Sequence, residues 1–382
     1  MVEKMTSGPL QGLKVVEFAG IGPGPFCGMV LSDMGAQVVR IDRDKGAPVN
    51  QAMHVDGRGR SAIAANLKDN RSIAACLAIC DRADIVIEGY RPGVMERLGL
   101  GPHVMLARNP RLVYGRMTGW GQQGPYAQRA GHDINYIAIT GALAGIGTQD
   151  RPVPPLNLVG DYGGGAMMLA VGLLAGVLSA RNTGQGQVVD ASISDGTCYL
   201  TSILYKLRAM GQWREQRAAN LLDGGAPFYD TYRCADGKFV AIGAIEPQFY
   251  ALLLEKTGLL DTLTQPQMDR ASWPQMKAVL ERTFASKTRE EWVAIMGDAD
   301  TCFAPVLDAA EAALDPHNIA RETFIEIGGV QQPAPAPRFS RTPSAVQASS
   351  QGEGSRSTLV DWGVSAGDID YLLSLATSGQ AN

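Results

Sequence analysis

Short apolar runs alternate with amphipathic stretches along the first third of the chain. Apolar positions with helical spacing fill 26–35 and 69–80. Between and around them lie runs rich in Val and Ile, which are typical of buried parallel strands: Leu13–Ala19, Val38–Asp42, Asp84–Glu88 and Leu112–Met117. Strands that alternate with helices are joined by parallel crossovers, so this pattern predicts a doubly wound α/β sheet.

The pattern changes after residue 125. The stretch 162–180 carries no charge, contains five glycines and is bordered by Asp161. We expect it to form a helix buried between the sheet and a neighbouring subunit rather than a membrane span. Another strand is expected at 187–192, after Gly184, because glycine favours the left-handed end of a helix.

A smaller α+β unit is expected further along the chain. Residues 227–244 read as two alternating β runs around an Ala-Asp-Gly turn, which predicts a hairpin, and helical patterns follow at 248–257 and 289–296. The Pro-rich stretch 331–343 is expected to be an extended linker. We expect 346–358, rich in Ser and Gly, to be mobile and 366–376 to form a short helix.

Composition narrows the class of protein. The 382 residues are 45% hydrophobic and 19% charged, which is ordinary for a globular protein, and the net charge of −4 argues against a nucleic-acid binder. The six cysteines and four histidines show no metal-like spacing, so no metal is expected and the cysteines are interpreted as thiols. Neither end of the sequence carries an apolar leader or a peroxisomal signal, which predicts a cytoplasmic enzyme.

A glycine cluster follows the first predicted strand. Gly20, Gly22 and Gly24, with Asp42 about 20 residues further on, resemble a dinucleotide-binding loop. The spacing differs from that motif, and Pro23 and Pro25 remove two N–H donors that a pyrophosphate would need. An NAD-linked oxidoreductase therefore stays a weak alternative.

Four cations lie near the predicted carboxyl ends of strands or at the start of a helix: Arg43, Lys68, Arg91 and Arg97. Open α/β sheets bind ligands at that edge, and the guanidinium fork suits phosphate oxygens. The group therefore indicates a ligand with several phosphates, although each cation alone could be an ordinary solvated side chain.

Three ionisable residues stand among glycines and apolar residues: His132, Asp161 and Glu246. Glycine lets a ligand approach closely, and partial burial moves a carboxyl pKa toward the range useful for proton transfer. Backbone N–H groups at the helix start beside Asp161 could hold an anion. The alternatives are structural: a helix cap for Asp161, a packed His132, and an ordinary helix start where Glu246 precedes Pro247.

Several longer stretches carry a resemblance that covers about residues 8–345. They are similar to the class III CoA-transferase family, in its α-methylacyl-CoA racemase branch, at Gly12–Pro25, Asp33–Arg43, Gly115–Gln122, Gly131–Tyr136, Asn157–Asp161 and Gly243–Tyr250. No GxSxG, P-loop or SxxK motif competes with this interpretation.

The resemblance implies an architecture. A Rossmann-like large domain of residues 1–190 and 330–382 would bind coenzyme A, 191–224 would be linker helices, and 225–329 would be a small α+β domain with the return linker. Two chains would interlock as a homodimer. The implied substrate and CoA contacts are Ile21, Arg43, Ala65, Asn66, Leu67, Lys68, Gly89, Tyr90, Arg91, Arg97, Gly131, Asp133, Ile134, Asn135 and Tyr136.

The resemblance also implies an activity. His132 and Asp161 would be the acid and base that interconvert (2R)- and (2S)-2-methylacyl-CoA thioesters through an enolate, and Glu246 of the other subunit would hold His132. No metal, nicotinamide, flavin, membrane or nucleic acid would be needed. CoA transfer with Asp161 as nucleophile is the nearest alternative, and a non-catalytic acyl-CoA binder is another.

Overall fold

The computed structural model describes residues 8–43 and 55–378. Within these limits the chain forms two compact units. The large unit comprises Met1–Thr140, Leu156–Leu200 and Ala320–Asn382, and the small unit comprises Gly141–Pro155 and Thr201–Ile319. The expected domain bounds, with linker helices at 191–224, stay a prediction. The terminal segments used for the expected location, 1–7 and 379–382, lie outside the described residues.

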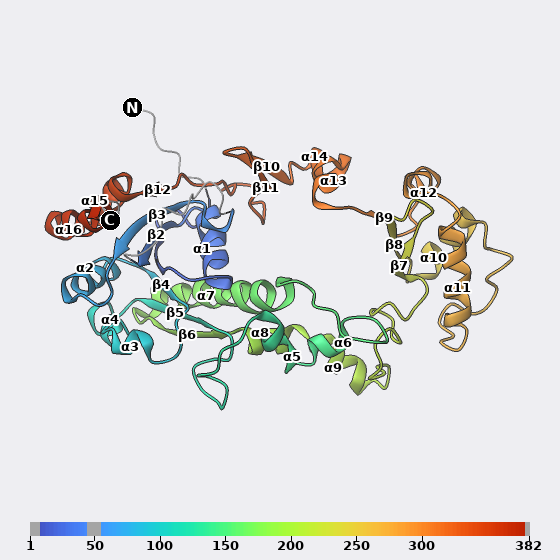
Figure 1. Cartoon of the computed structure of the whole chain (residues 1–382), viewed down its shortest axis with the longest axis horizontal. Coiled ribbons are helices and arrows are strands. Elements are labelled where there is room, and N and C mark those ends of the chain that lie inside the picture. The colour runs from blue at the N-terminus through green and yellow to red at the C-terminus, as the bar shows by residue number, and fades with distance from the viewer. Residues whose placement is uncertain (1–7, 44–54, 379–382) are drawn as a thin grey trace. The chain divides into compact units, whose positions relative to one another are not determined.

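The large unit is built on a parallel sheet of seven strands (Figure 1). Their spatial order is β12-β3-β2-β1-β4-β5-β6, so the strand order reverses between β1 and β4. The strands are β1 (Lys14–Phe18), β2 (Gln37–Arg43), β3 (Arg60–Ala65), β4 (Ile85–Glu88), β5 (Val113–Thr118), β6 (Gln187–Ser192) and β12 (Ser350–Gln351). The predicted doubly wound sheet is therefore confirmed, and the two predicted helices between its first strands are present.

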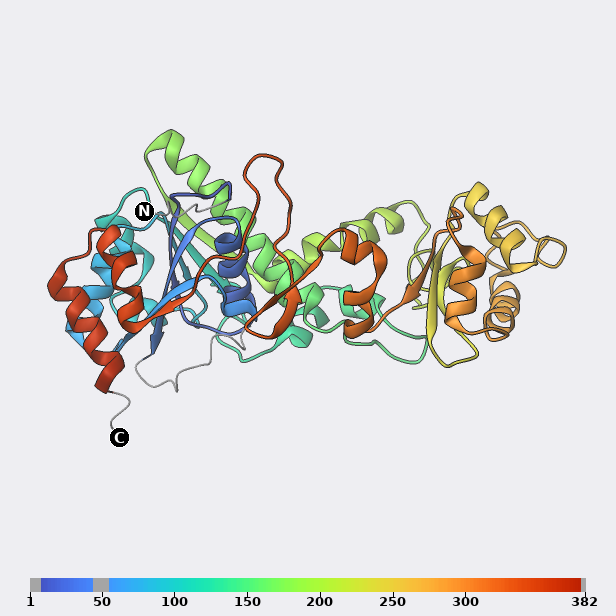
Figure 2. The same ribbon diagram turned by 90° about the horizontal axis from the view of Figure 1, so that it is seen from above.

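Helices cover both faces of this sheet. On one face, Cys27 and Leu31 of α1 and Leu169 and Leu173 of α7 form a buried apolar cluster with the strands. The opposite cluster is formed with α2, α4 and α16, and Figure 2 shows the C-terminal helices beside α2. The helices are α1 (Pro23–Asp33), α2 (Asn70–Cys80), α3 (Val94–Arg97), α4 (Pro102–Arg108), α5 (Asp133–Ala138), α7 (Met168–Thr183), α8 (Ile193–Leu200), α15 (Arg356–Asp361) and α16 (Ala366–Ser378), with 3-10 turns at Val55–Gly57 and Gly352–Ser355.

The Ser/Gly-rich stretch 346–358 is ordered, so the expectation of a mobile segment is wrong. It contains β12, which pairs in parallel with β3 at the edge of the sheet. Small polar side chains make this possible: Ser350 Oγ lies 3.0 Å from Ser61 Oγ, and the buried Ser355 donates its hydroxyl hydrogen to the carbonyl of Ala62. Serine can satisfy its own hydroxyl while its backbone joins a strand.

The long apolar helix starts earlier than expected. A π-helical segment, η3 (Leu158–Met167), continues directly into α7, and Gly184 ends α7 with a φ of 76° as predicted. Among the described residues, Leu158–Thr183 is long and apolar enough to cross a membrane, and half of its most apolar window is buried. Val171 and Leu178, on the face away from the sheet, are 62% and 63% exposed.

The small unit contains an antiparallel sheet of three strands, β7 (Tyr229–Arg233), β8 (Phe239–Gly243) and β9 (Phe303–Val306). The predicted hairpin is confirmed as β7 and β8. Its helices are α6 (Ala142–Gly145), α9 (Ser202–Ala209), α10 (Pro247–Thr257), α11 (Trp273–Phe284), α12 (Arg289–Met296) and α13 (Ala309–Leu314), and α14 (Pro316–Ala320) leads back to the large unit.

The Pro-rich linker begins inside a two-stranded ladder of β10 (Phe324–Ile327) and β11 (Val330–Pro333).

Candidate active site

A pocket of about 660 Å³ lies at the carboxyl edge of the large sheet, where the strand order reverses. Ligands of open α/β sheets bind in this place, because the loops after neighbouring strands diverge there. The pocket is lined by the end of β5, by the loops after β1, β4 and β5, by α5, and by one residue each from α1, η3 and α8. The lining residues are Ile21, Gly22, Pro23, Gly89, Tyr90, Arg91, Pro92, Met117, Thr118, Gly119, Trp120, Ala127, Arg129, Ala130, Gly131, His132, Asp133, Asn135, Tyr136, Asp161 and Ile193.

Asp161 reaches this pocket from the first part of η3. The helix begins at Leu158 with Asn157 in the cap position, so the alternative that Asp161 caps the helix is wrong. Its backbone N–H is also not free to hold an anion, because it donates to Oδ1 of Asp133 at 2.6 Å. A π-helical turn is wider than an α-helical one and is frequently found at functional sites.

Glycines around Asp161 have two different uses. A Cβ at Gly164 would lie 2.5 Å from Oγ1 and 2.7 Å from N of Thr197, so this glycine lets η3 pack against α8. For Gly164 the expected role in ligand approach is therefore wrong. Gly22 is different: it has a φ of +76°, and a Cβ there would lie 3.2 Å from Oδ2 of Asp161. The bare backbone of Gly22 thus leaves room beside the Asp161 carboxylate.

His132 enters the same pocket from the start of α5. It occupies the cap position with an extended backbone, and its N–H donates to Oδ1 of Asn135 at 3.0 Å. The imidazole is exposed and acts electrostatically on Asp161. Two residues 29 positions apart in the sequence, which spacing alone could not bring together, therefore share one pocket.

The Asp161 carboxyl has an unusual pKa for an aspartate. Burial and then the nearby charge of Asp133 raise it to about 6, while a hydrogen bond from the Asn157 side chain and the charge of His132 lower it. Both effects that raise it disfavour the ionised form. A carboxyl group with a pKa near neutrality can both accept and return a proton under physiological conditions.

Aromatic side chains form one wall of the pocket. The Tyr136 and Trp120 rings meet edge to face at 4.8 Å, and the Tyr136 hydroxyl donates to the carbonyl of Gly131. Gly119 passes under Tyr136, where any Cβ would collide with the ring. Trp120, Gly119 and Arg129 were not identified as site residues from the sequence; the signal was present in the motif at 115–122, where Trp120 stands between two glycines.

The predicted phosphate-binding residues divide into two groups. Tyr90 and Arg91 line the pocket, and the Arg43 guanidinium lies 5.2 Å from the centre of the Tyr90 ring. Ala65 is paired with Arg43 in the register of β3 and β2, but its side chain is buried, so only its backbone could meet a ligand there. The remaining predicted contacts line the pocket, except for five that do not: Asn66, Leu67, Lys68, Arg97 and Ile134. Lys68 lies in the turn before α2 and not on the helix.

A buried ion pair supports the loop that carries Tyr90 and Arg91. Glu88, at the end of β4, accepts the Tyr90 N–H at 2.7 Å and a hydrogen bond from Nε of Arg116 at 2.9 Å. Arg116 also binds Glu96. Burial raises the pKa of Glu88 to about 7, against the opposing effects of the Tyr90 N–H and of Arg116. The Glu88 carboxylate is fully buried, and it fixes the backbone of the loop at Tyr90.

Within the described residues, the acidic residue that would complete a dinucleotide-binding pattern, Asp42, is not free. Asp42 is paired with Arg40 at 2.9 Å, and Pro23 forms the first turn of α1. Arg60, fully buried against Glu17, donates to the carbonyl of Pro25 and so fixes the end of the loop. In the described parts of the chain no group of three or more His, Cys, Asp or Glu could hold a metal ion.

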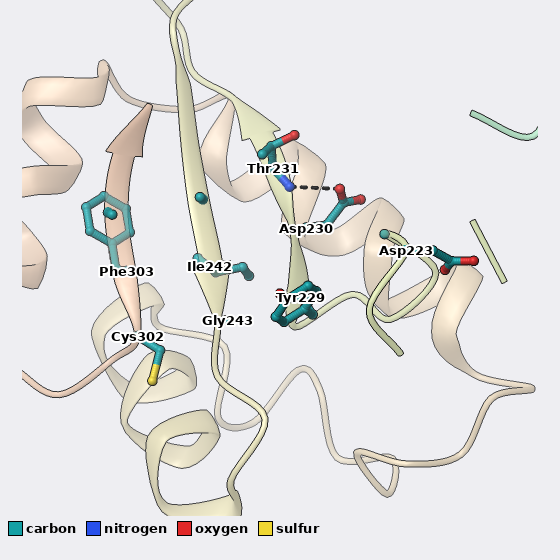
Figure 3. Close-up of a pocket in the computed structure, with 11 residues that line it drawn as sticks. Asp223, Tyr229, Asp230, Thr231, Ile242, Gly243, Cys302 and Phe303 are labelled. Carbon is teal, nitrogen blue, oxygen red and sulfur yellow. Dashed lines mark hydrogen bonds between the residues drawn. The ribbon is translucent and has the colours of Figure 1, made fainter. Parts of the chain in front are cut away.

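Glu246 belongs to the small unit, where it is exposed and precedes Pro247 at the start of α10, as its sequence context predicts. A pocket of about 520 Å³ lies in the same unit, along the strands β7, β8 and β9 (Figure 3). Cys302 is at its edge, and burial, followed by the charge of Glu246, raises the pKa of the Cys302 thiol. The residues that line this pocket include none of the predicted site residues.

Comparisons with known proteins identify the family of the chain. Residues 10–351 match the model of CoA-transferase family III. The chain is 46% identical over 368 residues to the α-methylacyl-CoA racemase of Mus musculus, covering 95% of this chain and 96% of the mouse protein. It is 45% identical over 337 residues to the α-methylacyl-CoA racemase of Homo sapiens, covering 88% and 87%.

Solved structures show the same fold. The crystal structure of Rv3272 from M. tuberculosis is 26% identical in sequence, has a TM-score of 0.75, and is matched over 92% of this chain and 99% of that one. Because the family model spans most of the sequence and the racemases align along nearly all of it, the chain belongs to CoA-transferase family III.

Proposed function

We propose that the protein is a racemase that interconverts (2R)- and (2S)-2-methylacyl-CoA thioesters by proton transfer at the α-carbon. The observation that carries this proposal is the presence of His132 and Asp161 in one pocket, with the pKa of Asp161 raised to about 6. The identity of 46% to a named α-methylacyl-CoA racemase supports the same reaction.

The reaction requires two bases on opposite faces of one carbon. The α-proton of a thioester is weakly acidic, and its removal gives an enolate that fixed dipoles must stabilise. In one direction His132 removes the proton and protonated Asp161 delivers another to the opposite face. In the reverse direction ionised Asp161 is the base and the imidazolium of His132 is the acid, so the two residues exchange roles without a cofactor.

The active site would be completed by a second copy of the chain. In this part of the proposal Glu246 of one subunit hydrogen-bonds His132 of the other, and two chains interlock as a homodimer. The apolar face of α7 supports an association, because Val171 and Leu178 lie seven residues apart on a helix and are both exposed. Glu246 itself is exposed in the single chain and so is accessible to such a partner.

The CoA part of the substrate would lie along the carboxyl edge of the sheet. Arg91 is a pocket residue, and Arg43 is next to the Tyr90 ring, which gives two guanidinium groups on one side of the pocket. Arginine binds phosphate oxygens through paired hydrogen bonds. The exposed Lys68, in the turn before α2, and the exposed Arg97, at the end of α3, would extend this positive surface toward the outer phosphates.

The expected cytoplasmic location is part of the same proposal. Burial raises the pKa of the Cys76 thiol to about 12, and Cys27 and Cys80 are also buried as thiols. Protonated, buried cysteines are typical of proteins in reducing compartments.

CoA transfer between carboxylic acids is the second candidate, since the half-buried Asp161 carboxylate is accessible from the pocket. In that reaction Asp161 would attack the thioester carbonyl, expel the CoA thiolate and form a mixed anhydride. The α-carbon would keep its hydrogen throughout. The two candidates therefore differ in what happens at a single C–H bond.

The test incubates the purified protein with one epimer of a 2-methylacyl-CoA in D₂O. NMR follows α-deuteration, and chiral chromatography of the hydrolysed acid follows the loss of optical purity. We expect both to proceed together. Transfer of CoA to added free acids, with the α-proton and the configuration retained, would replace the racemase by the transferase.

A further inference from the structure

We propose that Asp133 is the positioning residue for the Asp161 base, and that it couples the two proposed bases to each other. This inference rests on the proposed racemase function and deepens it. Sequence resemblance assigns Asp133 only to substrate contact, whereas the structure gives its carboxylate a different partner: Oδ1 accepts the backbone N–H of Asp161 at 2.6 Å.

The local structure is arranged to allow this contact. Gly160 precedes Asp161, and a Cβ at Gly160 would lie 2.8 Å from Cγ of Asp133 and 2.8 Å from Cγ2 of Ile137. Any other residue at position 160 would therefore push the Asp133 carboxylate away from the Asp161 N–H. A buried glycine at this position is explained by the close approach of α5 to η3.

Asp133 also joins the two bases through the chain itself. It is the first residue of α5, directly after His132 in the cap position, and both line the pocket. The hydrogen bond from the Asp161 backbone thus ties η3 to the turn that carries the imidazole. Holding catalytic groups within a fraction of an ångström of the productive geometry depends on contacts of this kind.

The position of the Asp133 charge adds a second effect. The Asp133 and Asp161 carboxylates carry charges of the same sign, and their repulsion is the second largest cause, after burial, of the raised pKa of Asp161. The other groups that face Asp161 are His132 and Tyr136 of the same turn and helix and the amide of Asn157. An Asp133 side chain without charge should leave Asp161 easier to ionise.

Charged groups on the other elements packed against η3 act elsewhere. Asp33 of α1 binds Arg58, and Arg116 of β5 binds Glu88 and Glu96. Asp190 of β6 accepts the N–H of Gln122, Asp195 of α8 acts on Cys198, and Arg181 is in the last turn of α7. Asp133 is therefore the anion that the described structure sets beside Asp161.

The main variant is Asp133→Asn, which keeps an acceptor oxygen and removes the charge. In the pH profile of kcat/KM for α-deuteration of the epimer whose α-proton Asp161 removes, we expect the acid limb to move down by about one pH unit. Asp190→Asn is the matched control, because Asp190 also accepts a backbone N–H, at 3.1 Å from Gln122, and does not line the pocket. The control should keep the wild-type profile.

Gly160→Ala tests the geometry without removing the carboxylate. It should lower kcat about tenfold or more while KM changes less, because the pocket is retained and the Asp161 backbone moves. A circular dichroism melting curve monitors folding of each variant. An Asp133→Asn enzyme with the wild-type acid limb, or a Gly160→Ala enzyme with wild-type kcat, would overturn the proposal.

A measurement without turnover separates this proposal from the racemase assignment. Aspartates labelled at ¹³Cγ are titrated by NMR in wild-type and Asp133→Asn protein, and Asp161→Asn identifies the Asp161 signal. We expect a lower Asp161 pKa in Asp133→Asn. If the wild type shows no α-exchange but the Asp161 pKa is lower in Asp133→Asn, the racemase assignment fails and the role of Asp133 stands. If the wild type exchanges the α-proton but the Asp161 pKa is the same in both proteins, the racemase assignment stands and the role of Asp133 fails.

Discussion

Glu88 and Asp161 are two of the carboxylates in the large unit whose pKa is raised, and they differ in whether they are placed to react. Glu88, with a pKa near 7, is fully buried, and its two carboxylate oxygens accept hydrogen bonds from Arg116 and from the Tyr90 N–H. Asp161, with a pKa near 6, is half-buried, has a second aspartate beside it and opens into the pocket. A raised pKa alone therefore does not identify a catalytic acid; accessibility to a ligand does.

The largest difference between the two carboxylates is expected in activity. Asp161→Asn should lower racemisation by about 10²- to 10⁴-fold, because one proton donor and acceptor is lost. The variant should still exchange the α-proton of one epimer, the one facing His132, with retention of configuration. His132→Ala should show the opposite epimer preference, measured by α-deuteration of each pure epimer.

Glu88→Gln is the matched change for that experiment. The folded variant should keep activity within a few-fold of the wild type, because Gln retains an acceptor for the Tyr90 N–H. A loss as large as that of Asp161→Asn, in a protein that is fully folded, would mean that Glu88 takes part in the reaction and that the contrast is wrong.

For the free energy of unfolding, we expect Glu88→Gln to be the more damaging of the two variants. Glu88→Gln removes one of the two carboxylates that bind Arg116, while Glu96 still binds it, so we expect a loss on the order of 1 kcal/mol of unfolding free energy. Asp161→Asn should be neutral or stabilising, because it removes a partly buried charge next to Asp133. Urea denaturation of both variants at one pH measures the difference.

The raised pKa of Asp161 should also make the stability of the folded protein depend on pH. The pKa of Asp161 is raised from 3.8 to about 6 on folding, so its contribution is fully present below pH 3.8 and is lost as the pH rises through about 6. The wild type should therefore lose stability relative to Asp161→Asn between these pH values. A stability difference that is constant over pH 4–7 would show that Asp161 is not perturbed in the folded protein.

The smallest effect is expected at Asn157. Its side-chain hydrogen bond lowers the pKa of Asp161. For the epimer whose α-proton Asp161 removes, Asn157→Ala should therefore move the acid limb of the kcat/KM profile upward, opposite to Asp133→Asn. We expect a loss of less than about tenfold in kcat at the optimum. A downward movement of the limb would contradict the assigned hydrogen bond.

Hydrophobic periodicity was sufficient for most of the sheet and its helices. It missed β3, because that strand starts at Arg60, a residue that reads as surface but is buried against Glu17. It also missed β12, since serines hide a strand that pairs through hydroxyl contacts. Both strands are stabilised by polar partners far away in the sequence, which no local pattern contains.

The candidate site was predictable as a set of residues but not as a geometry. His132 and Asp161 stand out by residue type and glycine context, and both line the pocket. The π-helical start of the long helix had no signal in spacing, so Asp161 was assigned a possible cap that belongs to Asn157. The contact between Asp133 and the Asp161 backbone depends on how α5 meets η3, which is decided by packing.

The contact between Gly164 and Gly196 has a consequence for how this enzyme can diverge. A Cβ at Gly196 would overlap the backbone of Gly164, so main chain touches main chain where η3 crosses α8. Neither glycine can be exchanged for a larger residue there, because a Cβ on Gly164 would also meet the Thr197 side chain. We therefore expect substitutions that change substrate preference in the pocket-lining loop 119–131 rather than at this glycine contact.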